Sequence, residues 1–355
     1  MKKRKILFLG ETFRADAITW MKGLQEFGDF EIICWELQTP SNGFWNKFKR
    51  IFEFCFAYFK IKRIKDTQKP DIVIAERTTS YGFLAAISGI KPIAIAQQGR
   101  TDLWPEDSIL LPFKKIIQNY AFKKANLIHA WGQTMTFSML KAKVDFDKVL
   151  VLPKGIDLKV FKFKKECNNL IIKAIITRSL EIEYSHDIIL KAFSILKQKK
   201  INFELLIVGD GSQRQNLEKL AAQLNIQNNV IFCGRISNHS LPMLLQNANF
   251  YVSMPITEGV SASLFEAMAT GCYPIVSDVL GNQIFINNKK NGILVPVDDF
   301  QKLSDAIIWA FENQEQQIRA IDENRKFIET NANYEVNMKV ISNAYHKLIN
   351  EQKMA

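Results

Sequence analysis

Cysteine and histidine are scarce in this sequence of 355 residues, and those present share no spacing. The five cysteines stand singly along the chain, so neither a disulfide framework nor a zinc site is indicated. The four histidines are equally isolated, and no two have the spacing of a metal-ligand pair. We therefore expect free thiols in a reducing compartment and structural or exposed histidines. The residues are Cys34, Cys55, Cys167, Cys233, Cys272, His129, His186, His239 and His346.

Long apolar runs are also absent. No run approaches the roughly 18 uncharged apolar residues that are needed to cross a bilayer. The basic start at residues 1–5 is followed by only four apolar residues, which is too short for the apolar region of a signal peptide. No serine lies in a nucleophile elbow, and no Walker-type phosphate loop is present. These absences favour a cytoplasmic protein.

A surplus of basic residues is the first positive feature. The net charge is +11, and it is uneven: residues 1–160 contain 26 Lys and Arg against 16 Asp and Glu, and the remainder contains 21 against 20. Whatever anionic surface or ligand this surplus serves therefore meets the first half of the chain. The chain is 47% apolar and 23% charged, which is an ordinary globular composition, and its length suits two domains.

Short apolar runs alternate with amphipathic stretches, which predicts parallel sheets covered by helices on both faces. We predict an α/β protein with two similar doubly wound domains, residues 1–156 and 157–331, and a helix over 332–355 that packs back on the first domain. The expected strands are residues 5–9, 31–35, 70–75, 92–96, 125–130 and 148–152, then 170–176, 203–208, 230–233, 250–253 and 273–276.

The stretch at residues 254–278 (MPITEGVSASLFEAMATGCYPIVSD) reads as loop, helix and strand. Glu258 precedes the helical run, Glu266 lies inside it, and Gly271 stands where a left-handed C-cap is expected. The free N–H groups at the start of such a helix suit an anion such as a diphosphate. Two glutamates at this spacing also occur in many helices without a ligand, so the flanking motifs have to decide between the two interpretations.

Residues 44–65 (FWNKFKRIFEFCFAYFKIKRIK) form the most unusual segment. Polar residues recur every three or four positions, which predicts a helix with one polar stripe and a broad aromatic face. Seven basic residues and one glutamate give it a strong positive charge. Either the aromatic face packs on the sheet, or the helix binds an anionic membrane surface, with residues 112–124 (PFKKIIQNYAFKK) adding to the same face.

Several motifs occur in one order along the second half. Residues 152–157 read LPKGID, 205–217 read LLIVGDGSQRQNL, 230–236 read VIFCGRI, and NGILV at 291–295 follows the stretch with the two glutamates. This order resembles the donor domain of family 4 glycosyltransferases of the GT-B fold, over about residues 145–310. The resemblance implies two Rossmann-like domains facing a central cleft, with the nucleotide-sugar bound by the second domain.

The resemblance also assigns roles to individual residues. It implies that Glu266 holds the ribose hydroxyls and that Glu258 lies by the donor sugar. Gly259 and Val260 would offer backbone N–H groups near the diphosphate and the sugar. Further donor-site positions implied in this way are Gly209 and Gly211 beside the nucleotide, Arg235 at the base pocket, and Gly10 in the loop after the first strand.

The basic pair that steadies the leaving diphosphate departs from the family pattern. Arg178 is kept, but Tyr184 and Ser185 stand where members commonly have Lys and Gly. Either Tyr184 donates a neutral hydrogen bond, or another base such as Arg14 or Arg100 supplies the charge, or the donor differs. An Arg and Tyr pair also recurs within the family, so we keep Arg178, Tyr184 and Glu258 as the catalytic candidates.

The first half resembles the family only in pattern. Its acceptor-side candidates follow the expected ends of strands, and loop or capping duty is the alternative for each of them. The usual His-Gly of the family is Gln98-Gly99 here, and Gln98 cannot act as a base. The candidates are Glu11, Arg14, Gln98, Arg100 and Asp102.

The resemblance implies a retaining, metal-independent transferase without a cofactor. It would move a sugar from a nucleotide diphosphate donor to a saccharide or lipid-linked saccharide acceptor, in lipopolysaccharide, capsule or other surface polysaccharide or glycolipid assembly. We expect it either in the cytoplasm or peripheral on the inner face of the plasma membrane. The alternatives are a non-catalytic subunit that binds a nucleotide-sugar or a partner enzyme, a GT-B-fold epimerase, and a nucleic-acid-binding protein, which the packing-type aromatics of residues 44–65 disfavour.

Overall fold

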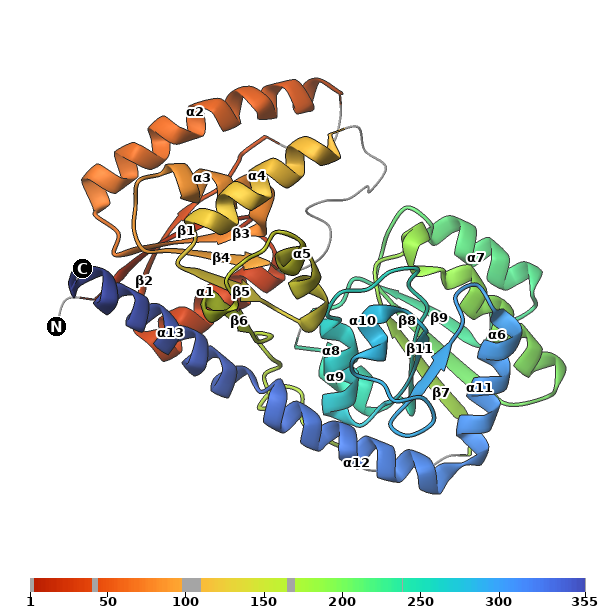
Figure 1. Ribbon diagram of the computed structural model, residues 1–355. Helices are drawn as coiled ribbons and strands as arrows, with labels where there is room; N and C mark the ends of the chain where they lie inside the picture. The colour runs from red at the N-terminus through yellow and green to blue at the C-terminus, as the bar shows by residue number, and fades with distance from the viewer. Residues whose placement is uncertain (1–2, 40–43, 98–109, 165–169, 238, 355) are drawn as a thin grey trace. The chain divides into compact units, whose positions relative to one another are not determined.

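The structure of the chain is a computed structural model that describes residues 3–39, 44–97, 110–164, 170–237 and 239–354 (Figure 1). The chain divides into two compact units. Unit 1 comprises Met1–Lys154 and Tyr334–Ala355, and unit 2 comprises Gly155–Asn333. The two chain positions at which the units change lie within two residues of the bounds that the sequence predicts.

Unit 1 is built on a six-stranded parallel sheet in the order β2-β1-β3-β4-β5-β6. Strands β3 and β4 are buried in every residue, as expected for central parallel strands with both faces covered. The strands are β1 (Lys5–Leu9), β2 (Glu31–Trp35), β3 (Ile72–Glu76), β4 (Ile93–Gln97), β5 (Leu127–Ala130) and β6 (Val149–Val151).

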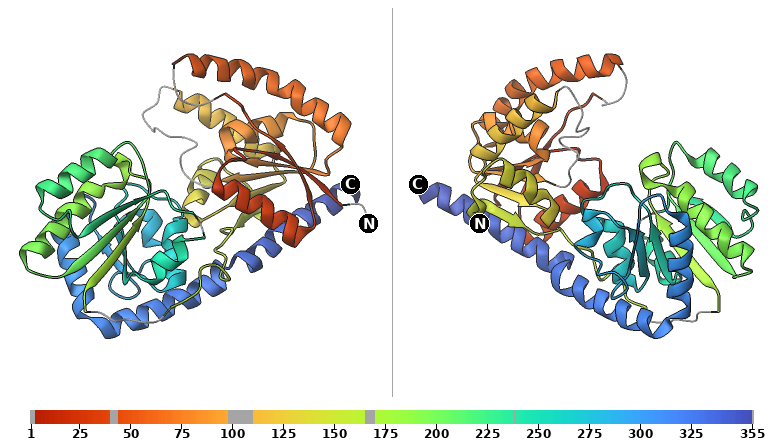
Figure 2. Two further views of the ribbon diagram at one scale, coloured as in Figure 1. Left: turned by 180° about the vertical axis from the view of Figure 1, so that it is seen from behind. Right: turned by 45° about the vertical axis from the view of Figure 1, so that its right-hand side comes forward.

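Helices cover both faces of this sheet (Figures 1 and 2). On one face α1 packs against the C-terminal helix α13, where a Cβ added to Gly23 would come within 2.8 Å of side-chain atoms of Met338 and Tyr334. The other face carries α2, α3 and α4. The helical segments are α1 (Ala15–Gly28), α2 (Phe44–Gln68), the π-helix η1 (Arg77–Tyr81), α3 (Gly82–Ile87), α4 (Leu111–Lys124), η3 (Gln133–Met135), α5 (Thr136–Lys141), η4 (Phe146–Lys148) and α13 (Tyr334–Met354).

Unit 2 repeats the plan with a parallel sheet in the order β12-β11-β10-β7-β8-β9. The predicted strands are all present, and β12 is a short additional strand within the NGILV motif, where no strand was predicted. The strands are β7 (Ile172–Thr177), β8 (Phe203–Val208), β9 (Val230–Gly234), β10 (Phe250–Ser253), β11 (Tyr273–Ser277) and β12 (Ile293–Val295).

Two hydrophobic clusters lie on the two faces of the unit 2 sheet. Alternate residues of β7 divide between them, with Ile172, Ala174 and Ile176 in one and Ile175 in the other. The first cluster is closed by α6, α7 and α11, and the second by α8 and α9, while α12 contributes Ala320 and Ile321 to the first and Ile328 to the second. The helical segments are η5 (Ile182–Tyr184), α6 (His186–Gln198), α7 (Arg214–Gln223), α8 (Leu241–Gln246), α9 (Ala262–Thr270), α10 (Leu280–Gln283), α11 (Phe300–Glu312) and α12 (Gln314–Asn331).

Helix α2 is oriented opposite to one of the two interpretations of its sequence. The interpretation in which its aromatic face packs on the sheet is wrong, because Phe52, Phe56 and Phe59 are exposed. The stripe of polar and small residues faces inward instead, and Ala57 is fully buried. Glu53 accepts hydrogen bonds from the backbone N–H groups of Gln38 and Thr39 at 2.6 and 2.9 Å, which fixes this orientation.

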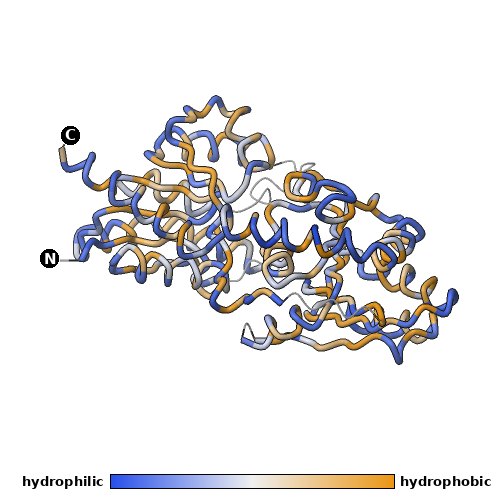
Figure 3. Tube along the Cα trace, turned by 90° about the horizontal axis from the view of Figure 1, so that it is seen from below, coloured by the Kyte–Doolittle hydropathy of each residue, from blue (hydrophilic) through white to orange (hydrophobic). Residues whose placement is uncertain are grey.

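The chain order of each sheet reverses at one point, between β1 and β3 in unit 1 and between β7 and β10 in unit 2. Loops that leave the carboxyl ends of two such strands diverge, and the space between them is where open α/β sheets bind ligands. The surface helices that surround the sheets alternate between hydrophilic and hydrophobic residues along their length (Figure 3). Because ligands bind where the strand order reverses, we expect the ligand-binding residues of each unit at these two reversal points.

Candidate functional site

Arg178 is the central side chain at the reversal point of unit 2. It follows β7 directly, and its Nη2 donates to the carboxylate of Glu258 and to the hydroxyl of Ser261, both from the loop after β10. The Arg178 and Glu258 side chains are only 14% and 12% exposed. Two of the three predicted catalytic residues therefore form a shielded ion pair at the carboxyl ends of two adjacent strands.

The surroundings of Arg178 keep it charged. Burial lowers the pKa of the guanidinium, but the neighbouring Tyr251, Glu258 and Tyr184 more than offset this, and the pKa is raised overall. The ring of Tyr184 lies with its centroid 5.2 Å from the Arg178 Cζ, which is cation–π geometry. Tyr184 therefore contacts the cation through its ring. The third predicted catalytic residue thus lies beside the other two.

Replacing Tyr184 tests which part of its side chain matters. Because the ring faces Arg178, Tyr184→Phe should retain kcat/KM for the sugar donor within a few-fold, whereas Tyr184→Ala should lose about tenfold, the value of a partly shielded cation–π contact. Steady-state kinetics of the two variants with the same donor makes the comparison. Equal losses in both variants would instead assign the role to the hydroxyl.

The loop that carries Glu258 ends at a capped helix. The Ser261 hydroxyl accepts a hydrogen bond from the Leu264 N–H at 3.1 Å and so caps α9, and the Gly259 N–H donates to the Glu258 carboxylate at 3.0 Å. Gly271 ends the helix with φ 99°, which confirms the predicted left-handed cap. Sequence reasoning missed Ser261, although a serine directly before a helical run is the usual signal of an N-cap.

Glu266 is half-buried on α9, one turn beyond Ser263. The Ser263 hydroxyl donates to the backbone carbonyl of Thr177, the last residue of β7, at 3.1 Å. Residues three apart lie on the same side of a helix. Glu266 is therefore on the side of α9 that approaches the carboxyl end of β7, where Arg178 begins.

Two glycines allow the loop after β8 to approach the Arg178 segment closely. A Cβ on Gly209 would lie 2.0 Å from the Arg178 carbonyl oxygen, and one on Gly211 would lie 2.5 Å from that of Leu180. Gly209 also has φ 148°, which side chains rarely allow. The predicted pair thus supports the backbone of Arg178. Gly281 does the same behind Glu258, with its added Cβ 2.4 Å from the Glu258 carbonyl oxygen, and no sequence signal had pointed to it.

Gly209→Ala should destabilise unit 2 by about 3 kcal/mol or more, since overpacking and a strained φ act together. Gly234→Ala is the matched control, because Gly234 has φ 69° but an added Cβ would meet only the flexible end of Arg214 at 3.3 Å. Strain alone predicts a loss of about 1 kcal/mol there. Urea unfolding of both variants measures the difference, and equal losses would contradict the close approach to Arg178.

The remaining donor-side candidates are placed less centrally. Val260 is half-buried against the second cluster of unit 2, and Arg235 is exposed just after β9, the edge strand beyond β8. Among the described residues, neither Val260 nor Arg235 makes a hydrogen bond, ion pair or ring contact with Arg178. Their predicted roles stay predictions.

The sequence predicts a structural or exposed His186, and the residue is buried beside the site at the start of α6. Burial, and then the charge of Arg178, lower its pKa to about 4, so the ring is neutral at pH 7. Its ring centroid lies 6.4 Å from that of Tyr184 in an edge-on arrangement. His186 therefore supports the Tyr184 ring without adding charge.

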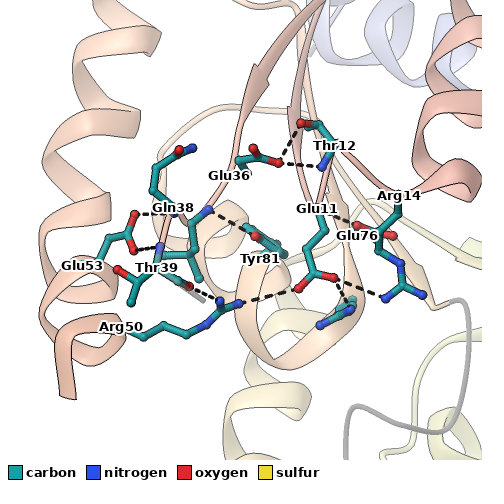
Figure 4. Close-up of polar contacts among 12 residues, drawn as sticks. Glu11, Thr12, Arg14, Glu36, Gln38, Thr39, Arg50, Glu53, Glu76 and Tyr81 are labelled. Carbon is teal, nitrogen blue, oxygen red and sulfur yellow. Dashed lines mark hydrogen bonds and ion pairs between the residues drawn. The ribbon is translucent and has the colours of Figure 1, made fainter. Parts of the chain in front are cut away.

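A second polar cluster lies at the reversal point of unit 1 (Figure 4). Glu11 follows β1, its N–H donates to the Glu76 carboxylate at 2.8 Å, and its own carboxylate faces three arginines. The distances to nitrogens of Arg77, Arg14 and Arg50 are 2.6, 3.3 and 3.7 Å. The predicted Glu11 and Arg14 are thus brought together, and the cluster adds two arginines and a buried glutamate that sequence reasoning did not single out.

Glu76 is fully buried at the end of β3. Burial raises the pKa of its carboxyl, and Asp16 adds to this, while the Glu11 N–H and the nearby Arg77 and Arg14 act in the opposite direction. A Cβ on Gly10 would lie 2.8 Å from the Glu76 Oε2, so the glycine makes room for this carboxylate.

A hollow of about 230 Å³ lies next to this cluster, at the end of β2. Thr12, on its wall, donates through both N–H and hydroxyl to Glu36, at 2.8 and 2.7 Å. The other predicted acceptor-side residues, Gln98, Arg100 and Asp102, lie outside the described residues. The lining residues are Thr12, Cys34, Trp35, Glu36, Gln38 and Lys60.

In the described ranges, no group of three or more His, Cys, Asp or Glu side chains is arranged to hold a metal ion. None of the helices in the described part of the chain combines the length and the apolar character needed to span a membrane.

The sequence is similar to known glycosyltransferases. Residues 161–327 match the family described as Glycosyl transferases group 1. The Bacillus subtilis (strain 168) protein named "Putative glycosyltransferase EpsF" is 26% identical over 242 residues, which cover 62% of this chain and 61% of that protein. This chain thus matches only about three-fifths of the length of EpsF.

Two solved structures share the fold over nearly the whole chain. Anabaena HepE, crystallised in complex with UDP, has a TM-score of 0.78 at 15% identity and covers 97% of this chain and 100% of its own. Sucrose-phosphate synthase from Thermosynechococcus elongatus has a TM-score of 0.81 at 15% identity, with 98% and 100% covered. The chain therefore has the GT-B fold, and its residues 161–327 are similar to the Glycosyl transferases group 1 family.

Proposed function

We propose that this protein is a retaining glycosyltransferase that moves a sugar from a nucleotide diphosphate donor to a saccharide acceptor, in the assembly of a surface polysaccharide or glycolipid. The observation that carries the proposal is the shielded, charged Arg178 at the reversal point of unit 2, directly beside the capped start of α9. A cation and the positive N-terminal end of a helix together suit the negative charge that develops on a leaving diphosphate.

Each residue of the site then has one task. Arg178 stabilises the departing diphosphate, and Tyr184 holds the guanidinium through its ring. Glu266 accepts hydrogen bonds from the ribose hydroxyls, and Glu258 orients the sugar. Because HepE was crystallised with UDP-glucose, a uridine donor is the first to test.

The reaction we propose takes place on one face of the sugar. The bond from the anomeric carbon to the diphosphate breaks, the acceptor hydroxyl forms the new bond on the same face, and its proton passes to the departing phosphate oxygen. The chain contributes position and electrostatic stabilisation. Arg178 supplies positive charge where the diphosphate leaves, so we propose that the reaction proceeds without a metal ion.

The acceptor is assigned to unit 1 in this proposal. The hollow at the end of β2 offers hydroxyl, carboxylate and amide groups that match sugar hydroxyls, and Trp35 offers an apolar surface for a sugar ring. The arginines around Glu11 favour an acceptor that carries a negative group, such as a phosphate-linked saccharide.

The test is a thermal-shift panel of nucleotide-sugars followed by a transfer assay with the best ligand. A stabilising nucleotide-sugar whose sugar is released or transferred, with the product anomer determined by NMR, is the expected result. A retained anomer and unchanged activity in EDTA support the mechanism. Binding without any turnover would point to a non-catalytic subunit, and interconversion of two nucleotide-sugars to an epimerase.

A further inference from the structure

The outward side of α2 is an exposed row of aromatic rings. Trp45 is 75% exposed, Phe52 66% and Phe59 64%, values far above those of side chains packed in a core. The spacing of three or four residues keeps the row on one side of the helix over about four turns. We call this row the aromatic stripe, and it consists of Trp45, Phe48, Phe52, Phe56 and Phe59.

Helix α4 extends the apolar surface. Phe113 is 62% exposed and Ile116 66%, and they precede Tyr120 on the same side of that helix. Phe83 of α3 connects the two helices, with ring centroids 6.1 Å from Phe54 of α2 and 5.8 Å from Tyr120 of α4. Both helices cover the same face of the unit 1 sheet (Figures 1 and 2). The stripe and the α4 residues thus belong to one side of unit 1.

The charge of this side is strongly positive. Residues 44–65 carry seven basic residues and one acid, and residues 112–124 carry four basic residues and no acid. Two of these basic residues lie elsewhere, because Arg50 pairs with Glu11 and Lys60 lines the hollow at the end of β2. The single acid, Glu53, is turned inward to Gln38 and Thr39, while Lys49, Lys62 and Arg63 are exposed beside the stripe.

We propose that the stripe and the adjoining face of α4 form a docking surface for the headgroup region of an anionic lipid bilayer. Aromatic rings that extend from a rim of basic residues are the composition that lies in a membrane interface, where rings enter the boundary with the acyl chains and cations meet anionic lipids. A second copy of the chain fits the surface poorly, because pairing would bring two strongly basic faces together.

The inference does not depend on the proposed function, but it connects with it. Arg50 lies on the inward side of α2, where it donates to the Thr39 carbonyl at 2.6 Å and pairs with Glu11. The helix that would meet the bilayer therefore also contributes to the acceptor-side cluster. If the proposed function holds, this arrangement suits an acceptor that is held in the same membrane by a lipid.

The first test is co-sedimentation of the full chain with phosphatidylcholine vesicles that contain phosphatidylglycerol, beside vesicles of phosphatidylcholine alone. We expect salt-sensitive binding to the anionic vesicles and recovery in the supernatant with the neutral ones. A double variant that combines Lys62→Gln and Arg63→Gln should show a partition coefficient about 25-fold lower. Each basic residue near an anionic leaflet contributes about 1 kcal/mol, or about fivefold.

The second test removes rings. Phe52→Ser with Phe56→Ser should reduce partitioning to anionic vesicles by about tenfold or more, since each ring loses its burial in the interface. Phe137→Ser with Phe146→Ser is the matched control, because both are exposed phenylalanines of unit 1 outside α2 and α4. The double variant Lys302→Gln with Lys347→Gln is the matched control for the loss of charge at Lys62 and Arg63. Both control variants should bind the vesicles like the unchanged chain.

Equal recovery in the supernatant with both vesicle types would overturn the proposal, as would equal losses in test and control variants. A concentration-dependent dimer in light scattering that the Phe52→Ser and Phe56→Ser change abolishes, without vesicle binding, would assign the surface to a second copy instead. Thermal unfolding of every variant shows whether it folds. Vesicle binding and dimerisation are both measured without a sugar donor. A failure of the docking proposal is therefore distinct from a failure of the transferase assignment.

Discussion

Replacing Arg178 by alanine should reduce kcat/KM for the nucleotide-sugar about a thousandfold. A cation about 4 Å from a phosphate is worth on the order of 4 kcal/mol at the effective dielectric typical of protein sites, and a factor of ten corresponds to about 1.4 kcal/mol. The effect should fall mainly on kcat, because the charge of the diphosphate grows as the sugar leaves. Steady-state kinetics with the donor identified by thermal shift measures it.

The change also removes the partner of Glu258, so a loss of folding has to be separated from a loss of catalysis. Arg178→Lys keeps a positive charge near Glu258 but lacks the planar guanidinium, and it should retain more activity than the alanine variant. Arg319→Ala serves as the control, because its ion pair with Glu315 at 3.4 Å is highly exposed. Unchanged activity in a folded Arg178→Ala protein would exclude the assigned site.

The sequence predicted the strands well because parallel strands that are covered on both faces are nearly continuous apolar runs. The runs over 5–9, 203–208 and 250–253 match β1, β8 and β10 residue for residue. Gly271 was predicted equally well, since a left-handed cap is a local requirement that one residue type meets best. Local sequence patterns were therefore sufficient to predict features that depend on the backbone conformation or on the burial of one strand.

The orientation of α2 could not be predicted in this way. Its pattern shows two distinct sides, and hydrophobicity favours the aromatic one for burial. The observed orientation depends on Glu53 reaching the backbone after β2 and on Arg50 reaching Glu11, contacts between segments far apart in the sequence. Tertiary hydrogen bonds to polar groups thus decided a choice that the helical period left open.

The sites show the same division. The motifs predict Arg178, Glu258 and Tyr184 as site residues, whereas Ser261, Gly281 and His186 approach those residues only in the folded chain. In unit 1 neither Arg50 nor Arg77 stands in a motif, and each reaches Glu11 only because β1 and β3 are neighbours and α2 covers them. Such support is a property of the folded chain and leaves little trace in one sequence.

Glu266→Ala should weaken the binding of the free nucleoside diphosphate by about 10- to 100-fold, because hydrogen bonds to a charged group contribute about 1.5–3 kcal/mol. Isothermal titration with UDP measures the affinity if the donor is a uridine nucleotide. Alanine is a strong helix former, so α9 should persist. Glu218→Ala on α7 is the matched control, since this half-exposed glutamate pairs with Arg214 on its own helix.

A nucleotide that lacks one ribose hydroxyl makes the assignment specific. If Glu266 accepts hydrogen bonds from the ribose, the unchanged protein should bind 2′-deoxy-UDP more weakly than UDP, and Glu266→Ala should bind the two nucleotides equally. The four affinities form a double-mutant cycle, whose coupling energy isolates the contact from any general effect of the substitution. Additive losses would place the ribose elsewhere and leave Glu266 with a structural role on α9. A coupling near the full loss would mean that the helix beside Arg178 selects a ribonucleotide donor through one carboxylate.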